Sequence, residues 1–356
     1  MHLLATVTAH GLGHLAQTAP VLDALRRRLP TLRLTVASSL PEARLRQRIG
    51  GDFHIEPRPL DFGFAMHDAF TVDLPASAAA YRALHADWPV HVAHTRAWLQ
   101  ALRPDLLLCN AAYLPLAAAA ELGLPAYGMS SLNWADLFAH LFGAEPWAAP
   151  IHAQMLQAYR SATAFVKPRP GMDMPALPNG RWAGPVARLG RQRRAELRQR
   201  LGLAEGERVV LVAFGGIDTR LPLQQWRFEA GVHWLVPEAW HFEHPRVSAF
   251  EALGWHFSDL MASVDAVLGK PGYGTFVEAA CLGTPVLYAP RPGWPEQAPL
   301  VQWLQAHARA VEVDEATLRS GALGDALQRL WRMPALPPVQ PTGADEVAAL
   351  LAAHAG

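Results

Sequence analysis

Short apolar runs alternate with longer amphipathic segments along the first half of the chain. The apolar runs cover residues 3–8, 32–37, 105–109 and 126–129. Helical spacing of apolar side chains covers residues 15–28, a segment after Pro41, and residues 114–122. Strands that alternate with helices are typical of a parallel, doubly wound sheet, so we expect a Rossmann-like α/β domain over residues 1–167.

A second alternation begins after a segment with little periodicity. Residues 168–187 are rich in proline and glycine and are predicted to form a linker. Short apolar runs then return at residues 208–213, 265–268, 286–289 and 310–313, which predicts a second Rossmann-like domain over residues 188–333. A proline-rich connection and a final helix occupy residues 334–356, and we expect this helix to pack back on the N-terminal domain.

The composition is that of a globular protein of two domains. The chain has 356 residues, 51% of them hydrophobic, and its 31 basic and 31 acidic side chains balance. This balance argues against nucleic acid or an anionic membrane as a partner, and the basic segment 188–200 is expected to be a solvated helix face. Cys109 and Cys281 lie in apolar surroundings, so we expect reduced thiols and a cytoplasmic setting.

The most apolar window, residues 106–129, has the composition but not the continuity of a membrane span. Pro115, Glu121, Gly123 and Pro125 divide it into strand, helix and strand. We therefore expect no transmembrane helix.

A glycine-rich turn in the second half has the features of a phosphate site. Gly272 and Gly274, with Tyr273 between them, stand between an apolar run and a helical segment that begins near Thr275. Free backbone N–H groups and the helix dipole attract anions at such a helix start. Lys270, one of two lysines against 29 arginines, precedes the turn. The alternative is a glycine turn and a capped helix without a ligand.

Glu278 follows one turn into the same helical segment. A carboxylate at this place can accept hydrogen bonds from both hydroxyls of a ribose. The segment therefore favours a phosphorylated nucleotide over a simple anion.

The first strand is followed by its own glycine turn, His10-Gly11-Leu12-Gly13-His14. Gly11, Gly13 and Ala16 fit the G-x-G-x-x-A pattern of dinucleotide folds, so an NAD(P) site is one alternative, although the second strand ends without an acidic residue. His14 stands where open α/β sheets bind ligands and could take a proton from a bound hydroxyl. A histidine that only caps the helix is the other possibility.

The turns HGLGH and FGG and the segment DLMASVDAVLGKPGYGT also carry a resemblance. The chain resembles the GT-B superfamily of nucleotide-sugar glycosyltransferases, with features of the plant UDP-glycosyltransferases and of the peptidoglycan N-acetylglucosaminyltransferase. The likeness is greatest to the glycosyltransferase-like N-terminal region of plant L-arabinokinase. The resemblance covers nearly the whole chain and implies the GT-B architecture, two Rossmann-like domains that face a cleft.

The resemblance also implies roles for individual residues. The diphosphate and its surroundings would involve Gly13, Gly215, Gly216, Lys270, Gly272, Tyr273, Gly274 and Thr275. Glu278 would hold the ribose and Phe257 the nucleobase. Glu296 and Gln297 would bind hydroxyls of the donor sugar, unless they are an exposed polar pair. His14 matches the position of the catalytic base.

One position departs from the plant pattern. Where those enzymes have an aspartate that orients the base, this chain has Asn110. An amide can orient an imidazole but cannot stabilise imidazolium by charge, so the strength of His14 as a base is open. Asp68, Asp73 or Asp136 could substitute from other loops.

The leading hypothesis is an inverting, metal-independent glycosyltransferase that needs no cofactor beyond a nucleotide-sugar donor, for which uridine is favoured. One alternative is a nucleotide-sugar binding or sensor protein without transfer, and another is an epimerase or hydrolase of the same fold. The acceptor is open between a small molecule and a lipid. Residues 132–147 are apolar enough to meet a lipid or to form a helix packed on its own domain.

Overall fold

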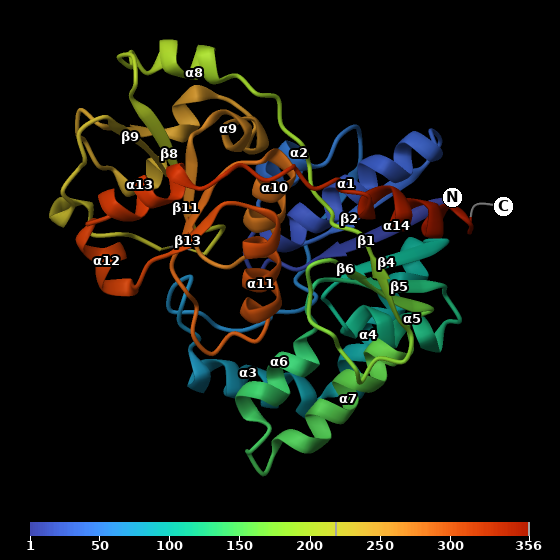
Figure 1. Cartoon of the computed structure of the whole chain (residues 1–356). Coiled ribbons are helices and arrows are strands. Elements are labelled where there is room, and N and C mark those ends of the chain that lie inside the picture. Colours follow the sequence, from blue (N-terminus) through green and yellow to red (C-terminus); the bar gives the residue numbers. More distant parts are fainter. Residues whose placement is uncertain (218, 355–356) are drawn as a thin grey trace.

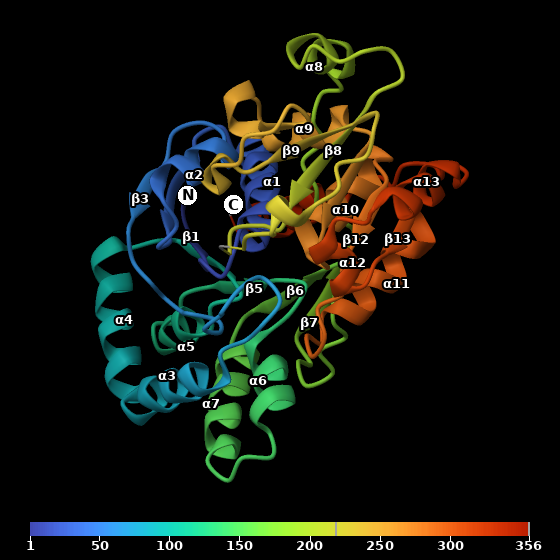
Figure 2. The same cartoon turned by 90° about the vertical axis from the view of Figure 1, so that its left-hand side faces the viewer.

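The computed structural model describes residues 1–217 and 219–354. Two parallel sheets, one of seven strands and one of six, are each flanked by helices and stand side by side (Figures 1 and 2). The predicted fold class, two doubly wound α/β units, is confirmed.

The first sheet has the strand order β3-β2-β1-β4-β5-β6-β7, and every neighbouring pair is parallel. Its strands are β1 (His2–Val7), β2 (Arg33–Ala37), β3 (His54–Glu56), β4 (Leu106–Asn110), β5 (Ala126–Met129), β6 (Ala164–Pro168) and β7 (Gly180–Ala183). Its helices are α1 (Gly13–Arg28), α2 (Glu42–Arg48), α3 (Leu74–Ala86), α4 (Trp88–Leu102), α5 (Leu114–Glu121), α6 (Trp134–Phe142) and α7 (Ala148–Arg160). The strand order reverses between β1 and β4, which is where such sheets bind ligands.

The second sheet has the order β10-β9-β8-β11-β12-β13, again parallel throughout. Its strands are β8 (Arg208–Ala213), β9 (Val232–Val236), β10 (Val247–Ala249), β11 (Ala266–Gly269), β12 (Val286–Tyr288) and β13 (Ala310–Glu312). Its helices are α8 (Arg194–Arg200), α9 (Phe257–Ser263), α10 (Tyr273–Leu282), α11 (Gln297–His307), α12 (Glu315–Ser320) and α13 (Gly324–Arg332), with three short 3₁₀ turns at Leu223–Gln225, Glu238–Trp240 and Phe250–Leu253. Here the order reverses between β8 and β11.

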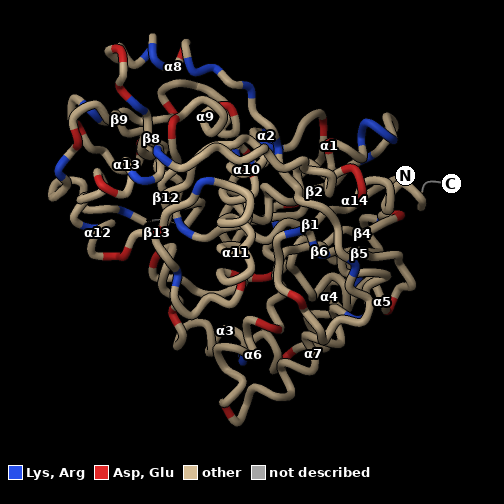
Figure 3. The backbone as a smooth tube through the Cα atoms, in the orientation of Figure 1, with Lys and Arg blue, Asp and Glu red and all other residues tan. Residues whose placement is uncertain are grey.

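The segment predicted as a linker contains a strand. β7 pairs in parallel with β6 and extends the first sheet into residues 180–183. Proline and glycine on both sides of this short strand hide its periodicity in the sequence. The backbone then continues to α8, whose arginines lie at the periphery of the molecule, as Figure 3 shows. The solvated basic face is thus confirmed, although the helix begins at Arg194 rather than at residue 188.

The last helix, α14 (Gly343–Ala352), returns to the N-terminal domain and packs along α1. The start of α14 also lies close to the backbone that follows β7, where a Cβ on Gly343 would lie 2.0 Å from the carbonyl oxygen of Gly184. None of the described helices is long and apolar enough to cross a membrane. The window 106–129 folds as β4, α5 and β5, as predicted.

Candidate functional site

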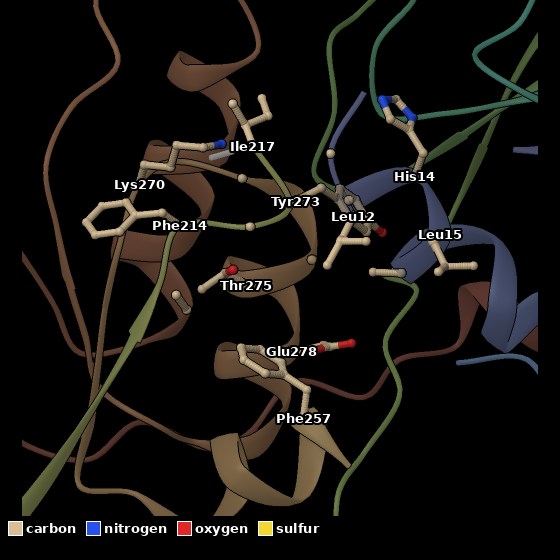
Figure 4. A pocket seen from close by; sticks show the side chains of 18 of the residues that line it. Leu12, His14, Leu15, Phe214, Ile217, Phe257, Lys270, Tyr273, Thr275 and Glu278 are labelled. Atoms are coloured by element: carbon tan, nitrogen blue, oxygen red, sulfur yellow. The ribbon is translucent and has the colours of Figure 1, made fainter. Parts of the chain in front are cut away.

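A cavity of about 520 Å³ lies between the two sheets, at the carboxyl ends of β1, β8 and β11. Both glycine turns contribute to its wall, together with the start of α10 (Figure 4). The predicted site residues that line it are Gly13, His14, Gly215, Gly216, Phe257, Lys270, Gly272, Tyr273, Gly274, Thr275, Glu278 and Glu296. Twelve of the fourteen predicted site residues therefore line one continuous cavity, whereas Asn110 and Gln297 are not among its lining residues.

The two domains approach each other closely at two glycines of the second domain, Gly216 after β8 and Gly274 in α10. A Cβ on Gly216 would lie 2.7 Å from Cγ of Leu12, and one on Gly274 would lie 3.0 Å from Cβ of Ala16. Larger residues at these positions would push the domains apart. Gly274 therefore lets α10 approach α1, and Gly216 lets the turn after β8 approach Leu12.

Lys270 follows β11 directly and is half-buried at the start of α10. Burial, and after it the nearby Arg291 guanidinium, lower the pKa of its ammonium to about 7, while the Glu296 carboxylate opposes both effects. A half-buried cation beside the free N–H groups of a helix start is an arrangement that attracts a multiply charged anion.

Arg291 is a second cation of the site, and the sequence analysis missed it. It is 3% exposed, and its guanidinium carbon lies 3.5 Å from the ring centre of Trp294. Burial lowers the pKa of the guanidinium to about 10. Its place three residues after β12, at the ligand-binding edge of the sheet, was the signal that could have identified it.

Glu278, the predicted ribose partner, already has a partner from the other domain. Nη1 of Arg48, at the end of α2, lies 2.8 Å from Oε1 of Glu278. The Glu278 side chain is 2% exposed, and that of Arg48 is 14% exposed. A ribose would thus compete with an ion pair that was not foreseen from the sequence.

Phe257 and Tyr273 differ in what they offer to a ligand. Phe257 is half-buried at the start of α9, with its ring 5.9 Å from that of Phe250 and the Arg48 guanidinium 5.7 Å above it. The Tyr273 hydroxyl instead donates to the carbonyl of Arg169 (3.1 Å) and accepts from the backbone of Val186 (2.9 Å). Tyr273 therefore anchors the interdomain connection, and its hydroxyl is engaged by backbone groups of that connection.

His14 lies in the first turn of α1, and its Nδ1 is 2.7 Å from Oδ1 of Asn110 at the end of β4. The register of the sheet causes this contact, because Asn110 pairs with Val7 and so ends level with the first glycine turn. Burial lowers the pKa of the His14 imidazole to about 4. The ring is therefore neutral near pH 7.

The three aspartates considered as substitutes for a carboxylate at position 110 serve other purposes. Asp68 accepts from the backbone of Phe70 and Thr71, Asp73 caps α3, and Asp136 lies beside Asn133 in the first turn of α6. Among the hydrogen bonds of the described residues, none joins these carboxylates to His14.

Glu296 and Gln297 have different contacts. Glu296 is buried and lines the cavity, where Oε1 accepts from Oγ of Ser131 at 2.6 Å and Oε2 accepts from Nε1 of Trp294 at 3.3 Å. The Gln297 side-chain oxygen accepts from the backbone N–H of Arg291 and holds the loop after β12. Glu296 therefore faces the cavity, and Gln297 supports the loop that carries it.

No family model matches the chain. L-arabinokinase of Arabidopsis thaliana is 25% identical over 335 residues, which are 91% of this chain and 31% of that protein. The chain thus spans about a third of the length of the curated relative it matches. The predicted sequence likeness to L-arabinokinase is confirmed.

Solved structures align over nearly the whole chain. The calicheamicin glycosyltransferase CalG4 has a TM-score of 0.63 at 17% identity, covering 99% of this chain and 98% of its own. The Streptomyces sp. SF2575 glycosyltransferase SsfS6, complexed with thymidine diphosphate, has a TM-score of 0.59 at 17% identity, covering 99% of both chains. A UDP-N-acetylglucosamine 2-epimerase has a TM-score of 0.58 at 14% identity, covering 100% of this chain and 97% of its own. This chain therefore has the GT-B fold, with its two α/β domains on either side of the cavity.

Proposed function

We propose that this protein is a glycosyltransferase that moves a sugar from a nucleoside diphosphate sugar to an acceptor hydroxyl. The observation that carries the proposal is the single cavity in which Lys270 and the start of α10 face His14. One wall suits a diphosphate, and the other suits a hydroxyl that must lose a proton. The acceptor is a small molecule or a lipid.

The donor half rests on charge and dipole. Lys270 and Arg291 are cations in a low-dielectric wall, and the N–H groups at the start of α10 are free to point at phosphate oxygens. Preorganised groups of this kind stabilise the charge that develops on a departing diphosphate. They supply the stabilisation that a metal ion would otherwise give, so we propose a metal-independent reaction without a further cofactor.

The acceptor half rests on the neutral imidazole of His14. Its Nδ1 is held by Asn110, which leaves Nε2 available to take the proton of the acceptor hydroxyl. The acceptor oxygen then bonds to the anomeric carbon of the sugar while the bond from that carbon to the diphosphate oxygen breaks. Attack from the face opposite the diphosphate inverts the anomeric centre.

The test begins with a thermal-shift screen of uridine and thymidine diphosphates and their sugars, because a ligand of the native state raises the melting temperature. With the donor so identified, His14→Gln should lower kcat by about a thousandfold and leave the donor Kd unchanged. Lys270→Met should weaken donor binding at least tenfold. EDTA should leave both quantities unchanged. A product with retained anomeric configuration, or full activity of His14→Gln, contradicts the proposal.

A second candidate is a nucleotide-sugar binding protein without transfer, which the neutral Asn110 beside His14 favours. An epimerase or hydrolase of the same fold is a third candidate, favoured by the structural likeness to a UDP-N-acetylglucosamine 2-epimerase. Incubation of labelled donor without an acceptor separates the binding protein from the epimerase and the hydrolase. The binding protein leaves the donor intact, whereas the other two release an epimer or a free sugar.

A further inference from the structure

A continuous chain of hydrogen bonds runs from His14 to Glu296 and crosses from one domain to the other. Nδ1 of His14 lies 2.7 Å from Oδ1 of Asn110, and Nδ2 of Asn110 donates to Oε1 of Gln17 at 3.4 Å. Nε2 of Gln17 donates to Oγ of Ser131 at 2.7 Å, and that hydroxyl donates to Oε1 of Glu296 at 2.6 Å. Each side chain in this chain is buried.

Two fixed groups set the direction of every bond in the chain. The Glu296 carboxylate can only accept, so Ser131 must donate to it and must accept from the Gln17 amide. The backbone N–H of Ser131 can only donate, and it lies 3.4 Å from Oε1 of Gln17. The Ser131 hydroxyl therefore requires the Gln17 nitrogen, and the Ser131 N–H requires the Gln17 oxygen. In this orientation the Gln17 oxygen also faces Asn110.

The orientation of the Gln17 amide also determines which atom of Asn110 faces the His14 imidazole. The Gln17 oxygen requires the Asn110 amide nitrogen to face it, and this leaves the Asn110 oxygen facing His14. An oxygen there accepts a proton from Nδ1, so the neutral ring carries its proton on Nδ1 and has its lone pair on Nε2. A reversed Asn110 amide would place its oxygen against the Gln17 oxygen, two acceptors face to face in a buried site, which costs about 1–3 kcal/mol.

We propose that Glu296, acting through Ser131, Gln17 and Asn110, fixes the tautomer of His14 and so takes over the orienting part of the role of the carboxylate that position 110 lacks. Gln17 and Ser131 are positioning residues. The two amides do not pass protons, so the chain orients the ring and does not relay its proton. The inference rests on the proposed function insofar as the oriented Nε2 serves an acceptor hydroxyl.

The experiment measures the tautomer of His14, which would not change if Gln17 and Ser131 only stabilised the fold. In the full chain with ¹⁵N-labelled histidine, ring-nitrogen shifts report which nitrogen carries the proton, and the signal missing from His14→Gln assigns His14. The native protein should show a neutral ring protonated on Nδ1. Gln17→Met, which removes both constraints on Asn110, should give a mixture of tautomers.

Two further variants locate the source of the constraint. Ser131→Ala cuts the link to Glu296 but keeps the backbone N–H, so it should shift the tautomer in the same direction by a smaller amount. Ser130→Ala is the matched control, since Ser130 is equally buried beside Ser131 but lies outside the chain. A native tautomer in Gln17→Met, or no difference between Ser131→Ala and Ser130→Ala, overturns the proposal.

A second substitution should restore the activity that Gln17→Met loses. Gln17→Met should lower kcat about tenfold at unchanged donor Kd, because part of the protein presents an N–H instead of a lone pair to the acceptor. Adding Asn110→Asp, which puts a carboxylate directly on Nδ1, should restore the single tautomer and most of kcat. Failure of this rescue overturns the proposal. If the native protein shows no turnover, the proposed function fails, and the tautomer measurement still decides this inference.

Discussion

Lys270 is a cation whose charge depends on what occupies the cavity. Burial and the Arg291 guanidinium hold the pKa of Lys270 at about 7, and a bound diphosphate should raise this pKa, so binding should take up a proton. The affinity for uridine diphosphate should therefore fall as pH rises from 7 to 9, by up to about tenfold per unit. Titration calorimetry in two buffers with different ionisation enthalpies measures both the affinity and the proton uptake.

Lys270→Arg is the matched variant for this prediction, because a guanidinium stays charged throughout that range. Its affinity should vary little between pH 7 and 9. An equal decline in both proteins would assign the pH dependence to another group.

Asp61 is a titratable group near His14, in the N-terminal domain. Its Oδ2 accepts from Nε1 of Trp134 at 2.7 Å, and the Trp134 ring lies 5.4 Å from that of His14. Burial raises the pKa of the carboxyl to about 6 from 3.8. Folding therefore favours the protonated form, so the stability that this group contributes is full below pH 4 and is lost as pH rises through 6.

Asp61→Asn removes that dependence. The free energy of unfolding of the native protein, relative to Asp61→Asn, should decrease by about 2 kcal/mol between pH 4 and 7. Urea unfolding at intervals across that range measures it. Parallel curves for the two proteins would mean that Asp61 titrates alike in the folded and unfolded chains.

At the scale of elements, α14 packs the C-terminal segment against the N-terminal domain. Leu351 of α14 is fully buried, and α14 packs along α1. Leu351→Ala should lower the free energy of unfolding by about 2–4 kcal/mol, because it leaves a cavity in this contact. Leu336→Ala, in the exposed connection before α14, is the control and should change it by less than about 1 kcal/mol. Equal effects in urea unfolding would show that α14 contributes little.

Strands with clear apolar runs could be predicted from the sequence, including the three-residue β12 and β13, whereas β3, β6, β7, β9 and β10 were not predicted. β1, β4, β8 and β11 are central strands buried on both faces, so their runs are continuous. β3 has three residues and lies at a sheet edge, where partial exposure weakens the pattern. β7 was hidden by its proline and glycine neighbours.

The site was predictable where it depends on backbone geometry. Glycine turns after strands identified Lys270 and His14, because the carboxyl ends of parallel strands meet at one edge. The partners Arg48, Gln17 and Ser131 were not predictable, since each meets its contact through tertiary packing over more than 100 positions. Sequence periodicity carries no information about such pairs.

At the scale of the whole molecule, the cavity residues are also the contacts between the domains. Ser131 meets Glu296, Arg48 meets Glu278, and the turns at Leu12 and Gly216 touch. A ligand that engages these groups must therefore act on the domain interface. Donor binding and the relative position of the domains are expected to be coupled.

Arg48 gives this coupling a measurable form. Its ion pair with the buried Glu278 carboxylate must break before a ribose can take both oxygens of that carboxylate. Arg48→Gln removes the competitor and leaves Glu278 without its cation until the donor arrives. The Kd for uridine diphosphate, measured by calorimetry, should therefore fall by about three- to tenfold, corresponding to about 1 kcal/mol. Arg46→Gln, on the same helix but paired with the exposed Glu42, should leave the Kd unchanged. Weaker binding by Arg48→Gln would instead mean that Arg48 contacts the donor itself. The two domains would then close on the ligand, and the Arg48–Glu278 ion pair would not have to break before the ligand binds.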